Sequence, residues 1–169
     1  MSENVTPEQL RQIRCLQEID EKFLSQIAAM ARLVEFPADK VLYREGQPLS
    51  NIYLILSGSV SLEICAAGVG CRRIMTVSAG DLLGITPAVG QSLSTGTTRT
   101  LSPTQAIELN ASQVLTLCEH NPRFGYEFMR QVALAISQRL SATRLQLLDV
   151  FGAERGADSE EDNKSRGTA

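Results

Sequence analysis

Hydrophobic residues recur along the chain at two different spacings, which divide it into three regions. Near the N-terminus they recur every three or four residues, as on an amphipathic helix. Residues 6–9, Thr-Pro-Glu-Gln, form a capping box with proline at the first helical position, which predicts a first helix. A second helix is expected from Asp20, with an apolar face of Phe23, Ile27 and Met30, and Pro37 ends the helical pattern.

Between Glu35 and about Leu109 the apolar residues fall in short runs instead. Four segments are rich in β-branched and aromatic residues, and turn signals built on glycine and proline separate them: KVLYRE, NIYLILSGSVSLEIC, CRRIMTVS and TQAIEL. Short strands at such close spacing predict an all-β sandwich or barrel for this region. NIYLIL is apolar on both faces, so it is expected to be a central strand.

Helical spacing then returns, and the last helix is unusually long. It is expected to be capped by Asn121-Pro122 and to continue without a breaker to about Phe151. Because a small β domain can cover only part of its apolar stripe, the rest is expected to pair in parallel with a second copy. The dimer residues would be Val132, Ile136, Leu140, Leu147 and Phe151. The alternative is a helix that lies across its own domain.

Composition narrows the classes of protein that fit. The chain has 169 residues, of which 43% are hydrophobic and 21% charged, as is ordinary for one globular domain. Its net charge of −3 argues against a nucleic-acid partner, which favours a basic surface. No apolar run fits a signal peptide or a bilayer span, so a cytoplasmic location without membrane attachment is expected.

The cysteines and the histidine predict neither a metal centre nor a catalytic site. None of the four cysteines belongs to a C-x-x-C pair, and His120 is the single histidine, so no metal ligands are assigned. Cys65 and Cys71 could face each other across a hairpin, but two free thiols are the expected state in a reducing cytosol. Without a nucleophile–base pair or a Walker motif, no catalytic residue is assigned and the enzyme hypothesis is rejected.

Two stretches carry a resemblance to a known family. They are FPADKVLYREGQPLSNIYLILSGSVSL and VSAGDLLG, in which Gly46, Gly58 and Gly80 occupy positions of turn glycines. The chain resembles the cyclic nucleotide-binding domain of the catabolite activator/FNR-type (Crp/Fnr) regulators. The resemblance implies an α+β fold: an eight-stranded antiparallel β jelly roll (double-stranded β-helix) flanked by N-terminal helices and a long C-terminal helix.

The expected organisation has four parts. Residues 1–15 form an N-terminal helix, and residues 16–120 form the jelly roll with its flanking helices. Residues 121–151 form the long dimerisation helix. Residues 152–169 lack large apolar side chains and are expected to form a disordered acidic tail.

The resemblance also assigns a ligand site in the loop GDLLGITPAVGQSLSTGTTRT, where the family holds a cyclic phosphate between its sixth and seventh strands. Gly84 matches the glycine of that cassette, and Ile85 takes the place of the glutamate that binds the ribose. Ser94 takes the place of the phosphate-binding arginine, and Thr95 matches the hydroxyl residue after it. Loss of both charged groups costs about 3–6 kcal/mol, or a factor of roughly a hundred to ten thousand in affinity. The cassette is therefore degenerate.

Two more residues are candidates for this site. Arg99 matches a later arginine of the following strand. If Arg99 were the phosphate arginine, only about ten residues would remain before the helix cap at Asn110, too few for a pair of strands. Thr143 matches a position where the long helix of the family contacts the purine base, and its alternative role is plain packing.

These features predict a non-enzymatic regulatory or sensor module without a cofactor. It would bind a small effector, either a cyclic nucleotide weakly or an unconventional ligand, and signal through its long helix as a homodimer. The alternative is a ligand-silent domain that serves as a dimerisation or protein–protein interaction module. No basic recognition helix or winged helix is recognisable, so DNA binding is not expected.

Overall fold

The structure is a computed structural model that describes residues 5–13 and 16–165, with side chains described as far as residue 149. Eight strands form two four-stranded antiparallel sheets. The first sheet contains, in spatial order, β1 (Arg32–Phe36), β8 (Thr104–Asn110), β3 (Asn51–Ser57) and β6 (Leu82–Leu83). The second contains β2 (Val41–Tyr43), β7 (Thr97–Thr100), β4 (Ser59–Ala66) and β5 (Gly70–Ser78). The expected jelly roll is confirmed, and β3, which contains NIYLIL, is an inner strand.

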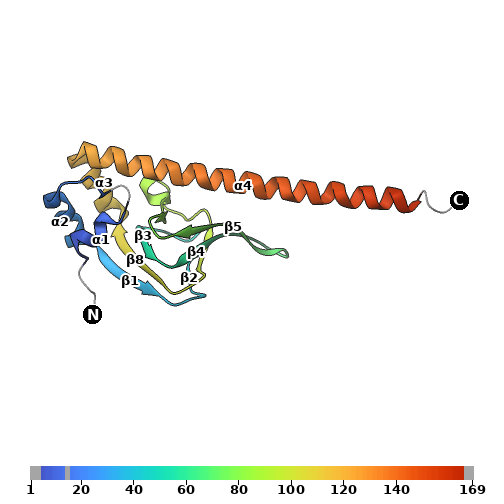
Figure 1. Cartoon of the computed structure of the whole chain (residues 1–169), viewed down its shortest axis with the longest axis horizontal. Helices are drawn as coiled ribbons and strands as arrows, with labels where there is room; N and C mark the ends of the chain where they lie inside the picture. Colours follow the sequence, from blue (N-terminus) through green and yellow to red (C-terminus); the bar gives the residue numbers. More distant parts are fainter. Residues whose placement is uncertain (1–4, 14–15, 166–169) are drawn as a thin grey trace.

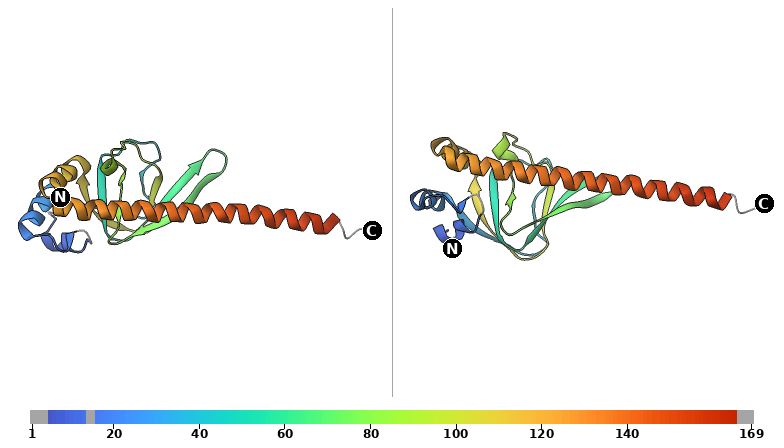
Figure 2. Two further views of the ribbon diagram at one scale, coloured as in Figure 1. Left: turned by 90° about the horizontal axis from the view of Figure 1, so that it is seen from above. Right: turned by 45° about the horizontal axis from the view of Figure 1, so that its top comes forward.

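Four α-helices flank the roll. They are α1 (Pro7–Arg11), α2 (Glu21–Met30), α3 (Ala111–His120) and α4 (Pro122–Ser165), and a short 3-10 helix, η2 (Thr86–Val89), lies between β6 and β7. Figure 1 shows α1, α2, α3 and the start of α4 gathered at one end of the strands. The rest of α4 runs alongside the roll and extends beyond it, which both views in Figure 2 confirm.

The N-terminal helices begin where the sequence predicts. The Thr6 hydroxyl oxygen accepts a hydrogen bond from the Gln9 backbone N–H at 3.3 Å, and the Thr6 N–H donates to Gln9 Oε1 at 2.9 Å. This reciprocal pair is the expected capping box. At the second helix, Asp20 Oδ1 accepts from the Phe23 N–H at 2.9 Å, which confirms Asp20 as its cap.

Two apolar clusters hold these elements together. The larger one joins every helix to the first sheet, with fully buried members such as Leu10 of α1, Leu24 of α2, Ile107 of β8, Val114 of α3 and Val132 of α4. The smaller one lies among the strands and consists of Tyr43, Ile55, Val60, Val77, Leu83 and Ala106. The start of α4 is thus anchored to the domain by burial, which is the dominant stabilising effect in such a core.

The long helix differs from the prediction at its far end. We expected it to end near Phe151, but α4 continues through Ser165 and contains 44 residues. Residues 152–165 contain good helix formers such as alanine, glutamate and arginine and no proline, and their two glycines weaken a helix by only about 1 kcal/mol each. The end expected at Phe151 is therefore wrong as a helix boundary. The side chain of Phe151 and the last four residues of the expected tail lie outside the described part.

The expectation of two free thiols in the hairpin between β4 and β5 is also wrong, because Cys65 and Cys71 form a disulfide. The register of these strands places the two residues directly opposite each other, with their Cα atoms 4.0 Å apart. A register shift between Leu62 and Glu63 contributes to this pairing. Cys118 of α3 is a half-buried free thiol, and burial raises its pKa to about 11.

Candidate ligand-binding site

The loop between β6 and β7, to which the resemblance assigns the phosphate-binding cassette, turns sharply at Gly84. Gly84 has φ of +71°, and a Cβ atom there would lie only 2.7 Å from the Asn51 carbonyl oxygen. Because of this φ and this short contact, a residue with a side chain fits at position 84 only if the backbone shifts. The loop then enters η2 and leaves it at Gly90, which has φ of +80°. Glycine is therefore required at position 84 for steric reasons, whereas its role in a ligand cassette stays a prediction.

Ile85, which the resemblance aligns with the ribose-binding glutamate, belongs to the apolar core. Its side chain is only 2% exposed and lies in the larger cluster, together with Ala88 of η2 and Phe128 and Val132 of α4. A side chain in this environment has no polar group to offer a ribose hydroxyl. Ile85 therefore belongs to the same core cluster as residues of α4.

Ser94 and Thr95 take different positions at the far end of the loop. Ser94 is buried, and its hydroxyl donates to the Gly96 carbonyl at 2.6 Å, so the hydroxyl is engaged within the loop itself. Its backbone is held by the turn after β2, because the Gly46 N–H donates to the Ser94 carbonyl at 2.8 Å. Thr95 is exposed to solvent. Of the two, only Thr95 presents an available hydroxyl.

Arg99 and Thr143 are not brought to the cassette by any hydrogen bond of the described residues. Arg99 lies within β7, an inner strand, and its half-exposed side chain forms an ion pair from Nη1 to Asp39 Oδ1 at 2.8 Å. Thr143 is exposed on α4, and its hydroxyl donates to the Arg139 carbonyl at 2.8 Å, one turn earlier. Their assignment as ligand residues therefore remains a prediction.

The dimer residues divide into two groups. Val132 is 1% exposed and packs in the larger cluster, so its assignment to a seam with a second copy is wrong. Ile136, Leu140 and Leu147 are 43%, 61% and 55% exposed and recur at helical spacing. The apolar stripe therefore leaves the core between Val132 and Ile136.

Three polar residues outside the predicted site lie where the roll faces α4; two are buried, and the third, Arg139, is half-buried. Tyr43 of β2 is 7% exposed, and its register partner Thr98 of β7 is fully buried. Burial raises the pKa of Tyr43, and the positive charge of Arg139 on α4 opposes this rise. Burial lowers the pKa of Arg139. The one feature of the sequence that could have pointed to this group of residues is Arg139, which lies one helical turn before the candidate Thr143.

Two of these residues have buried polar atoms without a hydrogen-bond partner among the described residues. They are Oγ1 of Thr98 and Nη2 of Arg139, and Thr86 Oγ1 at the start of η2 is a third such atom. Buried polar groups are nearly always paired, because an unpaired one costs about 1–3 kcal/mol. Unpaired groups on both the roll and the helix are therefore a feature that an ordered water molecule or a bound ligand would explain.

The space beside Arg139 is small. A cavity of about 30 Å³ lies between β5, β6 and α4, and Met75, Val77, Leu82, Gln138 and Arg139 contribute to its lining. This volume holds a water molecule or two, whereas pockets for drug-sized ligands occupy about 300–1,000 Å³. An occupant as large as a nucleotide would require α4 to move away from the roll.

The jelly roll, the cassette between β6 and β7 and the long helix that follows define the class of the protein. The family model of the cyclic nucleotide-binding domain matches residues 33–121. The chain therefore belongs to the cyclic nucleotide-binding domain family. No curated protein matches the chain.

Solved structures agree with this assignment. A protein from Geobacter metallireducens GS-15, described as a cyclic nucleotide-binding protein, is 25% identical, with a TM-score of 0.68 over 80% of this chain and 98% of that one. A cyclic nucleotide-binding domain from Methylobacillus flagellatus KT is 19% identical, with a TM-score of 0.68 over 84% and 80%. The catabolite activator protein of Thermus thermophilus is 18% identical, with a TM-score of 0.64 over 80% and 62%. The similarities to the second and third of these structures show a shared fold only.

Proposed function

We propose that the protein is a cytoplasmic, non-enzymatic regulatory module that binds a small effector between the jelly roll and α4 and signals through that helix. The observation that carries this proposal is the pair of unpartnered buried atoms, Thr98 Oγ1 on the roll and Arg139 Nη2 on α4. A ligand that satisfied both would bind the strand and the helix at once. Its binding would then bias the position of α4, as ligand-driven population shifts require.

The effector would differ from the usual one or bind more weakly. Ile85 and Ser94 supply neither of the two charged contacts to a cyclic nucleotide, and both are engaged in internal contacts. Arg139 offers a cation from the helix in place of one from the cassette. We therefore propose a small anionic effector, with cyclic nucleotides bound at best at sub-millimolar to millimolar concentration.

Calorimetric titration with cAMP and cGMP, up to millimolar ligand, tests this proposal. We expect small heats at high ligand concentration for the parent protein and their loss in Arg139→Gln. Micromolar binding would show that the cassette works without its two charged residues. Identical weak binding by the parent and Arg139→Gln would show that Arg139 does not contact the effector.

A second candidate function is a ligand-silent dimerisation or interaction module, and the exposed part of α4 favours it. Six large apolar residues there are 43% or more exposed: Leu134, Ile136, Leu140, Leu145, Leu147 and Leu148. A row of this kind is characteristic of an interaction surface, and a second copy of α4 fits it by its heptad-like spacing. No heat with either nucleotide, together with a stable dimer in sedimentation, would favour this function over effector binding.

None of the described helices combines the length and the hydropathy needed to cross a bilayer.

A further inference from the structure

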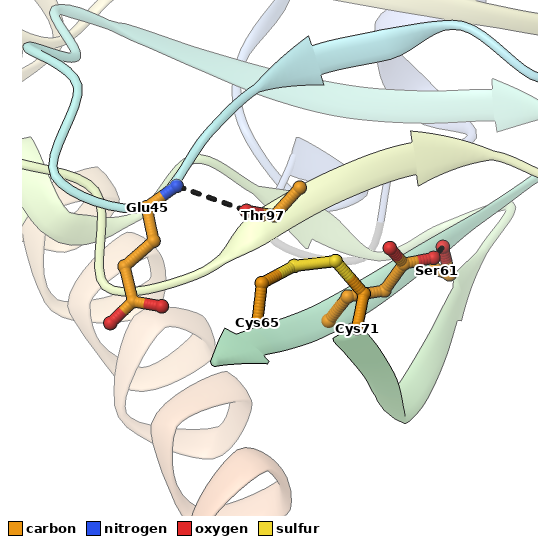
Figure 3. Close-up of a disulfide and its surroundings, with 6 residues drawn as sticks. Glu45, Ser61, Cys65, Cys71 and Thr97 are labelled. Atoms are coloured by element: carbon orange, nitrogen blue, oxygen red, sulfur yellow. Dashed lines mark hydrogen bonds between the residues drawn. A yellow bond between two sulfur atoms is a disulfide. The ribbon is translucent and has the colours of Figure 1, made fainter. Parts of the chain in front are cut away.

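The hairpin of β4 and β5 brings together three side chains that sequence spacing alone does not mark as a site. Cys65 and Cys71 are register partners across the hairpin, and Glu63 precedes Cys65 by two residues on β4. The two sulfur atoms and a carboxylate oxygen of Glu63 all lie within 4.8 Å of one another. Figure 3 shows the disulfide with Ser61 of β4 and Thr97 of the neighbouring strand β7.

Glu63 is held in an unusual environment for a carboxylate. Its residue is only 9% exposed, and no ion pair among the described residues includes it. Its Oε1 atom accepts a hydrogen bond from the hydroxyl of the fully buried Ser61 at 2.6 Å. Burial of a carboxylate without a nearby cation is energetically costly. The environment of Glu63 therefore favours the binding of a cation there.

The disulfide is accessible to a reductant, because Cys71 is exposed and Cys65 is half-buried. A dithiol reductant of the kind that keeps cytoplasmic thiols reduced would supply two electrons and two protons. The Sγ–Sγ bond breaks, Cys65 and Cys71 become thiols, and the reductant becomes a disulfide. Two soft ligands are then free beside a buried oxygen ligand.

We propose that, after reduction, Cys65, Cys71 and Glu63 form a Zn²⁺ site with a water molecule as the fourth ligand. Tetrahedral Zn²⁺ with Zn–S distances of about 2.3 Å and Zn–O distances of about 2.0 Å places its ligand atoms roughly 3.5–3.8 Å apart. The three ligand atoms already lie within 4.8 Å, so small side-chain rotations suffice once the sulfur–sulfur bond is broken. Binding releases the protons of the two thiols.

The donor set selects the type of metal. Two thiolates and one carboxylate suit Zn²⁺, whereas Mg²⁺ and Ca²⁺ prefer oxygen ligands alone. The Ser61 hydroxyl, which also lies 3.1 Å from the Arg99 carbonyl, orients the Glu63 carboxylate as outer-shell groups do in metal sites. The oxidised hairpin offers only the carboxylate, so metal binding and the disulfide exclude each other.

The test uses the full chain with Cys15→Ser and Cys118→Ser, which removes the other two thiols. Zn²⁺ affinity is measured by competition with a chromophoric chelator, on the oxidised protein and after anaerobic reduction. We expect one bound Zn²⁺ per reduced chain and binding at least roughly tenfold weaker after oxidation. Co²⁺ in place of Zn²⁺ should show a thiolate-to-metal absorption band, which identifies the ligands without any substitution of them.

Matched variants separate this site from adventitious binding. Glu63→Gln is expected to weaken Zn²⁺ binding roughly tenfold or more, and Ser61→Ala by about tenfold. Glu45→Gln, which changes a nearby exposed carboxylate outside the cluster (Figure 3), should leave the affinity unchanged. Equal affinity of the reduced and oxidised protein, no thiolate band with Co²⁺, or an unchanged affinity in Glu63→Gln would each overturn the proposal. Circular dichroism verifies that each variant is folded.

Discussion

The loop between β6 and β7 and the long helix α4 differ in the solvent exposure of their apolar side chains. In the loop between β6 and β7, Ile85, which the resemblance aligns with a ligand-binding glutamate, is buried in the core and offers no charged group. On α4, Leu140 and Leu147 remain exposed beyond the roll. The comparison teaches that Ile85 and Ser94 of the loop are engaged in internal contacts, while the helix retains unsatisfied groups of both kinds, polar at Arg139 and apolar beyond it.

The largest effect should come from the anchored part of α4. Phe128→Ala removes a side chain that is 2% exposed and stacks on Phe124 with ring centroids 5.8 Å apart, so we expect a loss of about 3–5 kcal/mol in the free energy of unfolding. Ile136→Ala, two turns later and 43% exposed, should cost much less in the monomer. Urea denaturation at low protein concentration measures both. Similar costs would mean that the stripe is anchored along its whole length.

The next largest loss of stability is expected from a substitution in the backbone turn at Gly84. Gly84→Ala places a Cβ atom 2.7 Å from the Asn51 carbonyl oxygen at positive φ, which we expect to cost about 3 kcal/mol. Gly90→Ala is the matched control, since its φ is also positive but nothing lies within 4 Å of the added atom. It should cost about 1 kcal/mol. Denaturant midpoints compare the two, and equal costs would show that strain alone governs the loop.

The exposed stripe is tested by its effect on association. Leu140→Glu with Leu147→Glu should raise the dimer dissociation constant at least about a hundredfold, equivalent to about 2.7 kcal/mol, because it places charges in an apolar seam. Sedimentation velocity over a range of concentrations measures the effect. A parent protein that stays monomeric at every concentration would refute the seam, and unchanged association of the variant would place it elsewhere.

The smallest effect has the opposite sign. Arg139→Met replaces a buried guanidinium nitrogen without a partner by an apolar side chain of similar length, so we expect a gain of about 1 kcal/mol in stability without ligand. Thermal unfolding measures this gain. A loss of comparable size would show that Arg139 stabilises the domain, and the proposed ligand contact would lose its main support.

Local chemistry made much of the fold predictable. The capping box at Thr6, the Asp20 cap and the short β runs act within a few residues, so the sequence displays them directly. The burial of Arg139 could not be predicted in this way, because it depends on where α4 crosses the roll. The sequence suggested that Cys65 and Cys71 face each other across a hairpin, but the disulfide was not predicted because a reducing cytosol favours free thiols. The alignment that assigns a cassette to this loop stays a prediction, and it could not show that Ser94 bonds to its own loop.

Because α4 is long, a small movement of the helix beside the roll produces a large displacement of its far end. From Val132, where the helix leaves the core, to Ser165 there are 33 residues, or about 50 Å at 1.5 Å per residue. A tilt of about 10° at that point would displace the far end by roughly 9 Å, about the distance between the axes of two packed helices. A small change beside Tyr43 and Arg139 would thereby act as a lever and decide whether the far ends of two such helices can meet.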